Sequence, residues 1–446
     1  MSKPKVSIIG AGSAGLLAAK KLAEKAEITI YDLGKSVKDR ICPERKTGTC
    51  ANCSLCSKTH GAGGAGLMSD GKLLFDTRVG NNLGEIIGSQ KNQRLVEEMI
   101  NFFESYGINQ VTKKTKEVEE LEIKALQNEI DFIYPKQTHI GSDKLPDFIK
   151  KVQKNLESKG VKFEYGKKIN HLDELKYDFL VLAPGRVGVA TGWMENILKE
   201  NNLEYSYRAV DIGVRVEVPH QIADPITNIS RDMKFYIRTK CNDDIVRTFC
   251  TCPKGYVGRE KYDGFNIVNG EASEGIDNHS GNTNFAILVT LPLTAPLANP
   301  NKAARLVAEA FHEYGGGKIM AQRLGDIKKR PAGRSKESKQ NNYVLHPTLN
   351  DVTWGDLRLP LTGRYCEDIL EMIDRLNSIM PGIASSQTIL YGPEIKFHGL
   401  KIKTDEYLHA GKNIYVAGDG AGVSRGIVGA ACSGLLTAEG ILKKIS

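Results

Sequence analysis

Three glycines near the start of the chain determine how it begins to fold. They form a Gly-x-Gly-x-x-Gly pattern between an apolar run, residues 6–9, and a helical run of leucines and alanines. Glycine allows a tight strand-to-helix turn, lets the backbone approach a diphosphate, and permits close packing of a helix on a sheet. A second apolar run, residues 28–32, completes a βαβ unit. We therefore predict a dinucleotide-binding fold in which the helix N-terminus holds a diphosphate. The predicted contacts are Gly10, Gly12, Ser13, Ala14 and Gly15.

Asp32 strengthens this interpretation. It ends the second apolar run, seventeen residues beyond Gly15. A carboxylate at that place accepts hydrogen bonds from both ribose hydroxyls and repels a 2′-phosphate. A second glycine fingerprint followed by an acid is missing from residues 150–340. We therefore expect one permanently bound dinucleotide.

The composition favours a globular protein over a disordered or membrane-spanning one. Of the 446 residues, 41% are hydrophobic and 26% are charged. The net charge of +8 comes from scattered Lys and Arg, which favours a solvated surface over a nucleic-acid groove. No apolar run reaches membrane-spanning length, and the first strand starts too early to leave room for a secretion signal. Nine cysteines, an odd number, argue for free thiols or metal ligands. We expect a cytoplasmic protein that binds neither nucleic acid nor membrane.

The order of predicted elements suggests a nucleotide fold interrupted by insertions. Helical spacing covers about 83–106 and 145–156, a buried strand covers 177–182, and alternating strands follow until a last buried strand at 413–417. The predicted parts are a discontinuous nucleotide-binding domain of residues 1–82, 136–190 and 385–446, a helical cap of 83–135, and an inserted α+β substrate domain of 191–384.

Two later segments resemble signatures of the FAD-binding class that includes glutathione reductase and hydroxybenzoate hydroxylase. They are the strand and turn at 178–185 and the strand end at 414–419. The resemblance implies a Rossmann-like α/β FAD-binding domain in which Asp419 hydrogen-bonds the ribityl chain; an ordinary helix N-cap is the alternative role for Asp419. The helix opening at Gly426 and Ile427 would direct its positive end at the pyrimidine side of the flavin. NAD(P)H could then act as a transient electron donor.

Spacing and this resemblance together suggest further cofactor contacts along the chain. These are Gly63, Gly64, Ala65, Ser69, Asp70, Gly71, Lys72, Phe163, Ala183, Gly185 and Gly418.

A narrower resemblance spans nearly the whole chain. It is carried by Cys42-Pro43, the glycine-rich loop at 61–66, Ser-Asp-Gly-Lys at 69–72, Phe-Cys-Thr-Cys-Pro at 249–253 and Gly-Asp-Gly-Ala-Gly at 418–422. These motifs resemble the bacterial and archaeal FAD-dependent dehydrogenase family, which implies a flavin oxidoreductase acting on a small molecule without naming that molecule. The chain departs from many relatives at Ala62 and at residues 423–425, where Arg425 could contact a substrate anion.

Four cysteines form a compact cluster before the second glycine-rich loop. Cys42, Cys50, Cys53 and Cys56 have the spacing C-x7-C-x2-C-x2-C, which lets one loop place four thiolates around a centre. Such ligands suit a [4Fe–4S] cluster or tetrahedral zinc, and free or redox-active thiols are the third reading. A cluster beside a flavin would act as a one-electron relay.

Cys250 and Cys252 are the candidate catalytic residues. Alternation on a strand would place both on one face, where a thiol could relay protons or electrons; small hydrophobic residues filling a strand surface are the alternative. Two other functions stay open. One is a flavin electron-transfer or redox-sensing protein that acts on a protein partner, and the other is a tRNA-modifying flavoenzyme.

Overall fold

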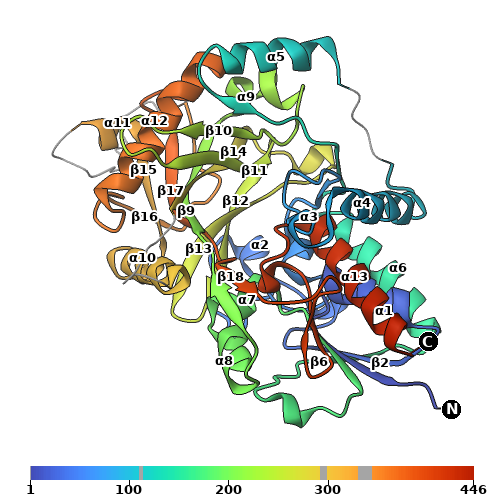
Figure 1. The fold of residues 1–446 in the computed structure, drawn as a ribbon. Helices are drawn as coiled ribbons and strands as arrows, with labels where there is room; N and C mark the ends of the chain where they lie inside the picture. Colours follow the sequence, from blue (N-terminus) through green and yellow to red (C-terminus); the bar gives the residue numbers. More distant parts are fainter. Residues whose placement is uncertain (1, 110–113, 292–298, 330–343, 446) are drawn as a thin grey trace.

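The computed structural model describes residues 2–109, 114–291, 299–329 and 344–445, and a six-stranded sheet forms one half of it (Figure 1). Five strands are parallel, and the edge strand β19 is antiparallel to β20. Across the sheet the strands are β19 (His409–Gly411), β20 (Ile414–Val416), β7 (Phe179–Leu182), β1 (Lys5–Ile9), β2 (Glu27–Asp32) and β6 (Lys162–Tyr165). A parallel sheet with β1 at its centre and helices packed around it confirms the predicted Rossmann-like class.

Two helices rich in small residues pack closely beside this sheet. Helix α1 (Ser13–Leu22) follows β1, and the C-terminal helix α13 (Ile427–Ile445) lies against α1. A Cβ on Gly434 would lie 2.1 Å from the carbonyl oxygen of Ala14, so the backbones of the two helices touch there. Helix α6 (Leu145–Ser158) contacts α1, and α4 (Ser89–Glu104) contacts α13. The position of α1 therefore depends on residues at both ends of the chain.

An eight-stranded sheet forms the other half. Its pairs are antiparallel except β15 with β16. In order the strands are β16 (Val352–Trp354), β15 (Ile319–Arg323), β17 (Ile389–Lys396), β9 (Val210–Pro219), β14 (Asn282–Leu291), β11 (Ile245–Cys252), β10 (Phe235–Arg238) and β4 (Asp131–Phe132). Helix α12 (Gly363–Ile379) packs on β9, β11 and β14, whereas α10 (Pro300–Tyr314) and the hairpin of β12 (Tyr256–Tyr262) and β13 (Phe265–Glu271) pack near β17.

Two strands of this sheet lie in segments that the sequence assigned elsewhere. Strand β17 falls in the range 385–446 expected in the nucleotide-binding part, but it pairs with β9 and β15. Strand β4 falls in the expected cap of 83–135, but it pairs with β10. The expected boundaries are wrong at these strands because strand pairing over long sequence separations decided their place, and neither segment carries a local signal for it.

Shorter elements complete the fold. They are α2 (Glu44–Thr47), β3 (Lys72–Leu74), α3 (Gly84–Ile87), α5 (Lys116–Leu126), β5 (Gln137–His139), α7 (Gly185–Ala190), α8 (Trp193–Glu200), β8 (Tyr205–Tyr207), α9 (His220–Thr227), α11 (Leu324–Lys328) and β18 (Leu400–Ile402). Strand β3 pairs with β5, and β8 pairs with β18. The pair of β8 and β18 joins the segment that leads into β9 of the second sheet to the segment that follows β17.

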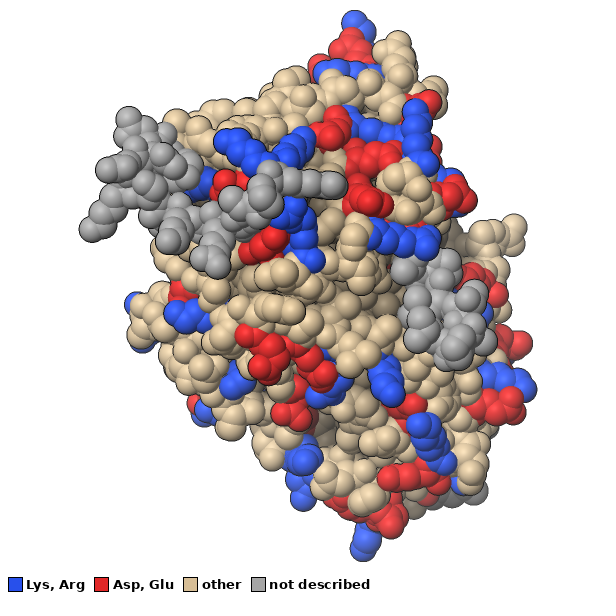
Figure 2. Space-filling model, turned by 90° about the vertical axis from the view of Figure 1, so that its left-hand side faces the viewer, with Lys and Arg blue, Asp and Glu red and all other residues tan. Residues whose placement is uncertain are grey.

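The surface carries both signs of charge. On the face shown in Figure 2, Lys and Arg are interspersed with Asp and Glu instead of gathering by sign. Within the described ranges, none of the helices has the length and apolar character needed to cross a bilayer.

The contact between α1 and α13 predicts a specific stability change. In Gly434→Ala the new methyl group meets the Ala14 carbonyl, so the helices must separate, and we expect unfolding to become easier by about 1–3 kcal/mol. Thermal and urea unfolding would measure this. Gly363→Ala is the control, because a Cβ there has no neighbour within 4 Å. Equal stability of the two variants would contradict the role given to this contact.

Candidate functional site

The turn between β1 and α1 is built from glycines that no other residue could replace without movement. Gly10 has φ +111°, and a Cβ on it would lie 2.1 Å from the carbonyl oxygen of Ala183. A Cβ on Gly15 would lie 2.0 Å from the carbonyl oxygen of Gly10. Gly12 is the N-cap residue of α1, and no side chain caps that end. The first amides of α1 are therefore available to an anion from the cleft described below.

Asp32 holds this turn from the end of β2. Its two carboxylate oxygens accept hydrogen bonds from the backbone N–H groups of Ala11, at 2.9 Å, and Gly34, at 2.8 Å. Each carboxylate oxygen can accept a further hydrogen bond. The ribose contact of Asp32 stays a prediction. In the structure, Asp32 holds together the turn after β1 and the loop after β2.

Arg40 holds the second glycine-rich loop and was missed in the sequence. Its buried guanidinium donates to the carbonyls of Ala62, at 2.6 Å, and Gly64, at 2.8 Å, and also to the carbonyl of Ser57, at 2.6 Å. Burial lowers the pKa of Arg40 to about 10, so it stays charged at neutral pH. One side chain thus ties the glycine-rich loop to the cysteine segment. A lone arginine between two motifs gave no signal of this.

The two glycine-rich loops meet at one wall of a cleft of about 1050 Å³. A Cβ on Gly64, which has φ +63°, would lie 3.1 Å from the Cα of Gly12. The lining includes many of the predicted cofactor residues: Gly12, Ser13, Ala14, Gly63, Gly64, Ala65, Ser69, Asp70, Lys72, Ala183, Gly185, Gly418, Asp419, Gly426 and Ile427. Segments from four separate parts of the chain therefore converge there.

Other predicted residues lie outside the lining. Gly10, Gly15 and Asp32 support the turn beneath it. Gly71, with φ +69°, turns the chain into β3. Phe163 lies on the edge strand β6, where its ring stacks on Tyr165 at 5.9 Å. The predicted cofactor contact of Phe163 thus has no counterpart in the cleft lining.

Asp419 lies at the end of the cleft near α13. Its carboxylate accepts a hydrogen bond from the Ser424 hydroxyl at 2.8 Å and lies 3.4 Å from the Arg186 guanidinium. Burial raises the pKa of Asp419, and Arg186 opposes that rise. The other carboxylate oxygen of Asp419 faces Arg186, so a role as helix N-cap does not account for both oxygens.

The wall from the second sheet is ionic. Lys234, Phe249 and Lys396 line it, and the ammonium groups of Lys234 and Lys396 lie 5.2 and 5.1 Å from the centre of the Phe249 ring. Arg425, from the segment before α13, also lines the cleft and lies 3.9 Å from Asp211 of β9. Burial lowers the pKa of Lys234, and its partner Asp232, at 2.5 Å, opposes this. These positive groups were missed because each stands alone in the sequence, apart from Arg425, which was singled out.

Lys72 joins the two walls. Its ammonium lies 2.8 Å from an Asp70 oxygen and 3.1 Å from an Asp232 oxygen, and it donates to the Thr251 carbonyl at 2.9 Å. These carboxylates raise the pKa of Lys72 above its ordinary value although burial opposes them. Lys72 therefore holds a positive charge in place between the half of the molecule that contains the glycine-rich loops and strand β11.

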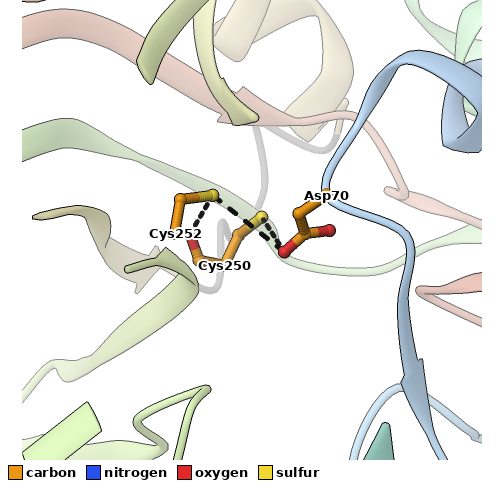
Figure 3. Close-up of side chains that lie close together, drawn as sticks. All are labelled: Asp70, Cys250 and Cys252. Carbon is orange, nitrogen blue, oxygen red and sulfur yellow. Dashed lines mark hydrogen bonds between the residues drawn. The ribbon is translucent and has the colours of Figure 1, made fainter. Parts of the chain in front are cut away.

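Cys250 and Cys252 lie beside Asp70 at the end of β11 (Figure 3). Their sulfur atoms are 3.9 and 4.0 Å from the same Asp70 oxygen. The three ligand atoms lie within 4.8 Å of one another. The strand does not alternate regularly here, because a register shift separates Phe249 from Cys252 and Cys250 has φ +49°. Only Cys250 lines the cleft, whereas Cys252 is fully buried.

The surroundings of the two thiols make them unequal. A hydrogen bond from the Cys252 side chain is the main cause that lowers the pKa of Cys250 to about 7; Lys72 and Arg215 also lower it, against burial and Asp70. The same hydrogen bond raises the pKa of Cys252 well above its ordinary value. Cys250 is therefore the thiolate of the pair, and Cys252 keeps its proton.

The four clustered cysteines line one pocket of about 370 Å³. Cys42, Cys50, Cys53 and Cys56 surround it together with Lys58, Arg259 and Lys261. Among the residues that the structure describes, no three of these sulfur atoms come within 4.8 Å of one another. The loop thus gathers the four cysteines without closing them around a single point.

Comparison with known proteins supports the flavin assignment. Residues 209–396 match the family model for the C-terminal domain-like part of FAD-dependent proteins. A protein of Clostridium beijerinckii, named only "Uncharacterized protein", is 25% identical over 480 residues, which cover 99% of this chain and 81% of the relative.

Solved structures of two oxidases are similar along nearly the whole chain. Pyridoxine 4-oxidase from Mesorbium loti has a TM-score of 0.44 and 11% identity, covering 99% of both chains. Glycine oxidase from Geobacillus kaustophilus has a TM-score of 0.40 and 12% identity, covering 99% of this chain and 95% of the oxidase.

The inequality of the two thiols predicts a pH dependence. A thiolate reacts and a thiol does not, so alkylation of reduced Cys250 should rise through about pH 7 instead of the ordinary value of about 8.5. Cys252→Ala removes the hydrogen-bond donor and should move the midpoint to higher pH. The rate is followed by mass spectrometry of the tryptic peptide 248–254. Cys366→Ala, on helix α12, is the control, and an unchanged midpoint in Cys252→Ala would refute the assignment.

Proposed function

We propose that this chain, whose residues 209–396 match the family model for the C-terminal domain-like part of FAD-dependent proteins, is an FAD-dependent oxidoreductase with its flavin in the cleft between the two sheets. The observation that carries the proposal is the convergence of four separate segments on that cleft. These are residues 12–14, 63–72, 183–185 and 418–427. Backbone approach at Gly12 and Gly64 leaves room for an extended ligand that side chains would exclude.

Each segment suits one part of FAD. The uncapped end of α1 would hold the diphosphate, and Asp32 would receive the ribose hydroxyls. Asp419 would hold the ribityl chain, with Arg186 fixing its orientation. The N-terminus of α13 at Ile427 would stabilise negative charge on the reduced ring. Bound flavin supplies the chemistry, accepting a hydride or an electron pair.

The ionic wall supports a small anionic substrate. Lys234, Lys396 and Arg425 line the side of the cleft that the glycine-rich loops leave open. Lys234 and Lys396 are buried, and the side chain of Arg425 is about 31% exposed. Lys234 is paired with Asp232 at 2.5 Å and Lys396 with Glu394 at 2.7 Å, whereas Arg425 lies 3.9 Å from Asp211. An anion such as a carboxylate can therefore pair with Arg425 in a bidentate manner. We infer that these residues orient the substrate against the flavin while the neutral backbone wall holds the cofactor.

The FAD assignment is tested by filling the space between the loops. In Gly12→Val the side chain points at Gly64, where the two loops meet at the cleft wall, so we expect bound flavin to fall more than tenfold, a loss of about 1.4 kcal/mol or more in binding. Flavin released on heating, relative to protein, measures this. Gly281→Val is the control, since a Cβ there meets nothing within 4 Å. Full yellow colour in Gly12→Val would refute the proposed seat of FAD.

The cysteine pocket favours an iron–sulfur cluster over zinc. Tetrahedral zinc with Zn–S bonds of about 2.3 Å needs sulfur atoms about 3.8 Å apart, closer than any three of these cysteines come. A four-iron cluster holds its thiolates farther apart than zinc does, which suits sulfur atoms that do not close around a single point. Lys58, Arg259 and Lys261 lie beside the cysteines, and Glu44 pairs with Lys58 at 3.1 Å and with Arg259 at 2.8 Å. Arg40 joins this segment to the glycine-rich loop, so such a relay would lie next to the flavin cleft.

Metal analysis tests the cluster. We expect protein purified without oxygen to contain iron and sulfide, about four of each per chain. Cys53→Ser should lose most of both because one ligand is removed. Cys241→Ser, which also changes an exposed cysteine, should keep them. Stoichiometric zinc without iron, or full iron in Cys53→Ser, would contradict the cluster.

A further inference from the structure

We propose that Cys250 and Cys252 form a redox-active dithiol that exchanges an electron pair with the flavin by opening and closing a disulfide between them. The inference rests on the proposed function and deepens it, because it assigns the pair as a second two-electron store beside the flavin. The structure shows the reduced pair, with both cysteines free.

The backbone brings the two sulfurs together. Residues two apart on a regular strand have Cα atoms about 6.6–6.8 Å apart, at the upper edge of what a disulfide accepts. The left-handed φ of Cys250 and the register shift of β11 break that extension. As a result the two sulfur atoms lie within 4.8 Å of each other (Figure 3). Such a conformation is rare for a residue other than glycine and is characteristic of functional sites.

The two sulfur atoms differ in their access to the cleft and in their burial. Cys250 lines the cleft and can meet a bound flavin or substrate, while Cys252 lies behind it and is shielded from both. Gly270 makes this packing possible, because a Cβ there would lie 2.7 Å from the Cys252 sulfur. The arrangement suits an outer sulfur that reacts and an inner sulfur that resolves.

The neighbouring charges favour a thiolate over a metal ion at this place. The trio of Asp70, Cys250 and Cys252 could in principle hold a cation. The Asp70 carboxylate is already paired with the Lys72 ammonium at 2.8 Å, and the Arg215 guanidinium donates to the Cys250 carbonyl at 3.2 Å. Lys72 also pairs with Asp232 and Arg215 pairs with Glu394, so Asp70 is not a free carboxylate ligand, while the two cations stabilise the Cys250 thiolate. The surroundings of the two sulfur atoms therefore favour redox chemistry over metal binding at this place.

The electrons and protons of the step balance within the protein and its flavin. When the disulfide forms, one S–S bond is made between the Cys250 thiolate and the Cys252 thiol, and the pair gives up two electrons and the one proton of Cys252. Oxidised flavin takes up both electrons and that proton and becomes the anionic reduced flavin. The reverse step cleaves the S–S bond and returns the flavin to its oxidised form.

Alkylation of the tryptic peptide 248–254 tests the proposal directly, since this peptide contains both cysteines and no others. Holoenzyme is oxidised with a stoichiometric disulfide oxidant or reduced with dithionite. It is then denatured in the presence of iodoacetamide and digested with trypsin. We expect no alkyl groups on the peptide after oxidation and two after reduction. Two alkyl groups in both states would overturn the inference without any variant being needed.

Anaerobic titration with dithionite provides the second measurement. Oxidised holoenzyme should take up two more electrons per flavin than Cys252→Ser, because the variant cannot form the disulfide. Cys366→Ser is the control and should match the parent protein. Equal uptake in the parent and Cys252→Ser would overturn the proposal. If the protein instead carries no FAD, the proposed function fails, while the alkylation result still reports on the dithiol alone.

Discussion

Backbone contact through glycine is the constraint on which the site depends. Gly10 lies against Ala183 and Gly15 against Gly10, so α1 leaves the sheet at an angle that a side chain at either position would change. Because Gly434 has no side chain, the backbone of α13 contacts the first turn of α1 directly. The end of α1 is thereby fixed by β1, β7 and the last helix together. A helix end held so firmly can present its amides to an anion without rearranging.

The cofactor side of the cleft was largely readable in the sequence because its signals are local. The glycines at 10–15 lie within one turn, and Asp32 lies at a fixed distance along one βαβ unit. Helices at 89–104 and 145–158 also followed from their spacing. Arg40 could not be found this way. Its role exists only because the chain folds back to bring the carbonyls of 57–64 around one guanidinium.

The second sheet shows the opposite case. Alternation predicted Cys250 and Cys252 on one face of a strand, but the strand is irregular there, and no glycine marks the left-handed residue. The sulfurs come together because of that irregularity. Lys234, just before β10, and Lys396, at the end of β17, likewise reach Phe249, and the neighbours of these two strands in the sheet are set by long-range pairing. No local pattern encodes such a meeting.

This difference explains why the cofactor is easier to infer than the reaction. One wall of the cleft is neutral backbone, whose glycines leave a recognisable pattern in any chain that binds a diphosphate. The other wall is made of buried charges that alternate in sign, with Asp70, Lys72, Asp232 and Lys234 in contact one after another. Burying such charges is tolerable only when each has its partner, so the row is a single unit. The combined charge of that row determines whether a substrate anion or a thiolate is stable beside it. No single residue in the sequence reveals this combined charge.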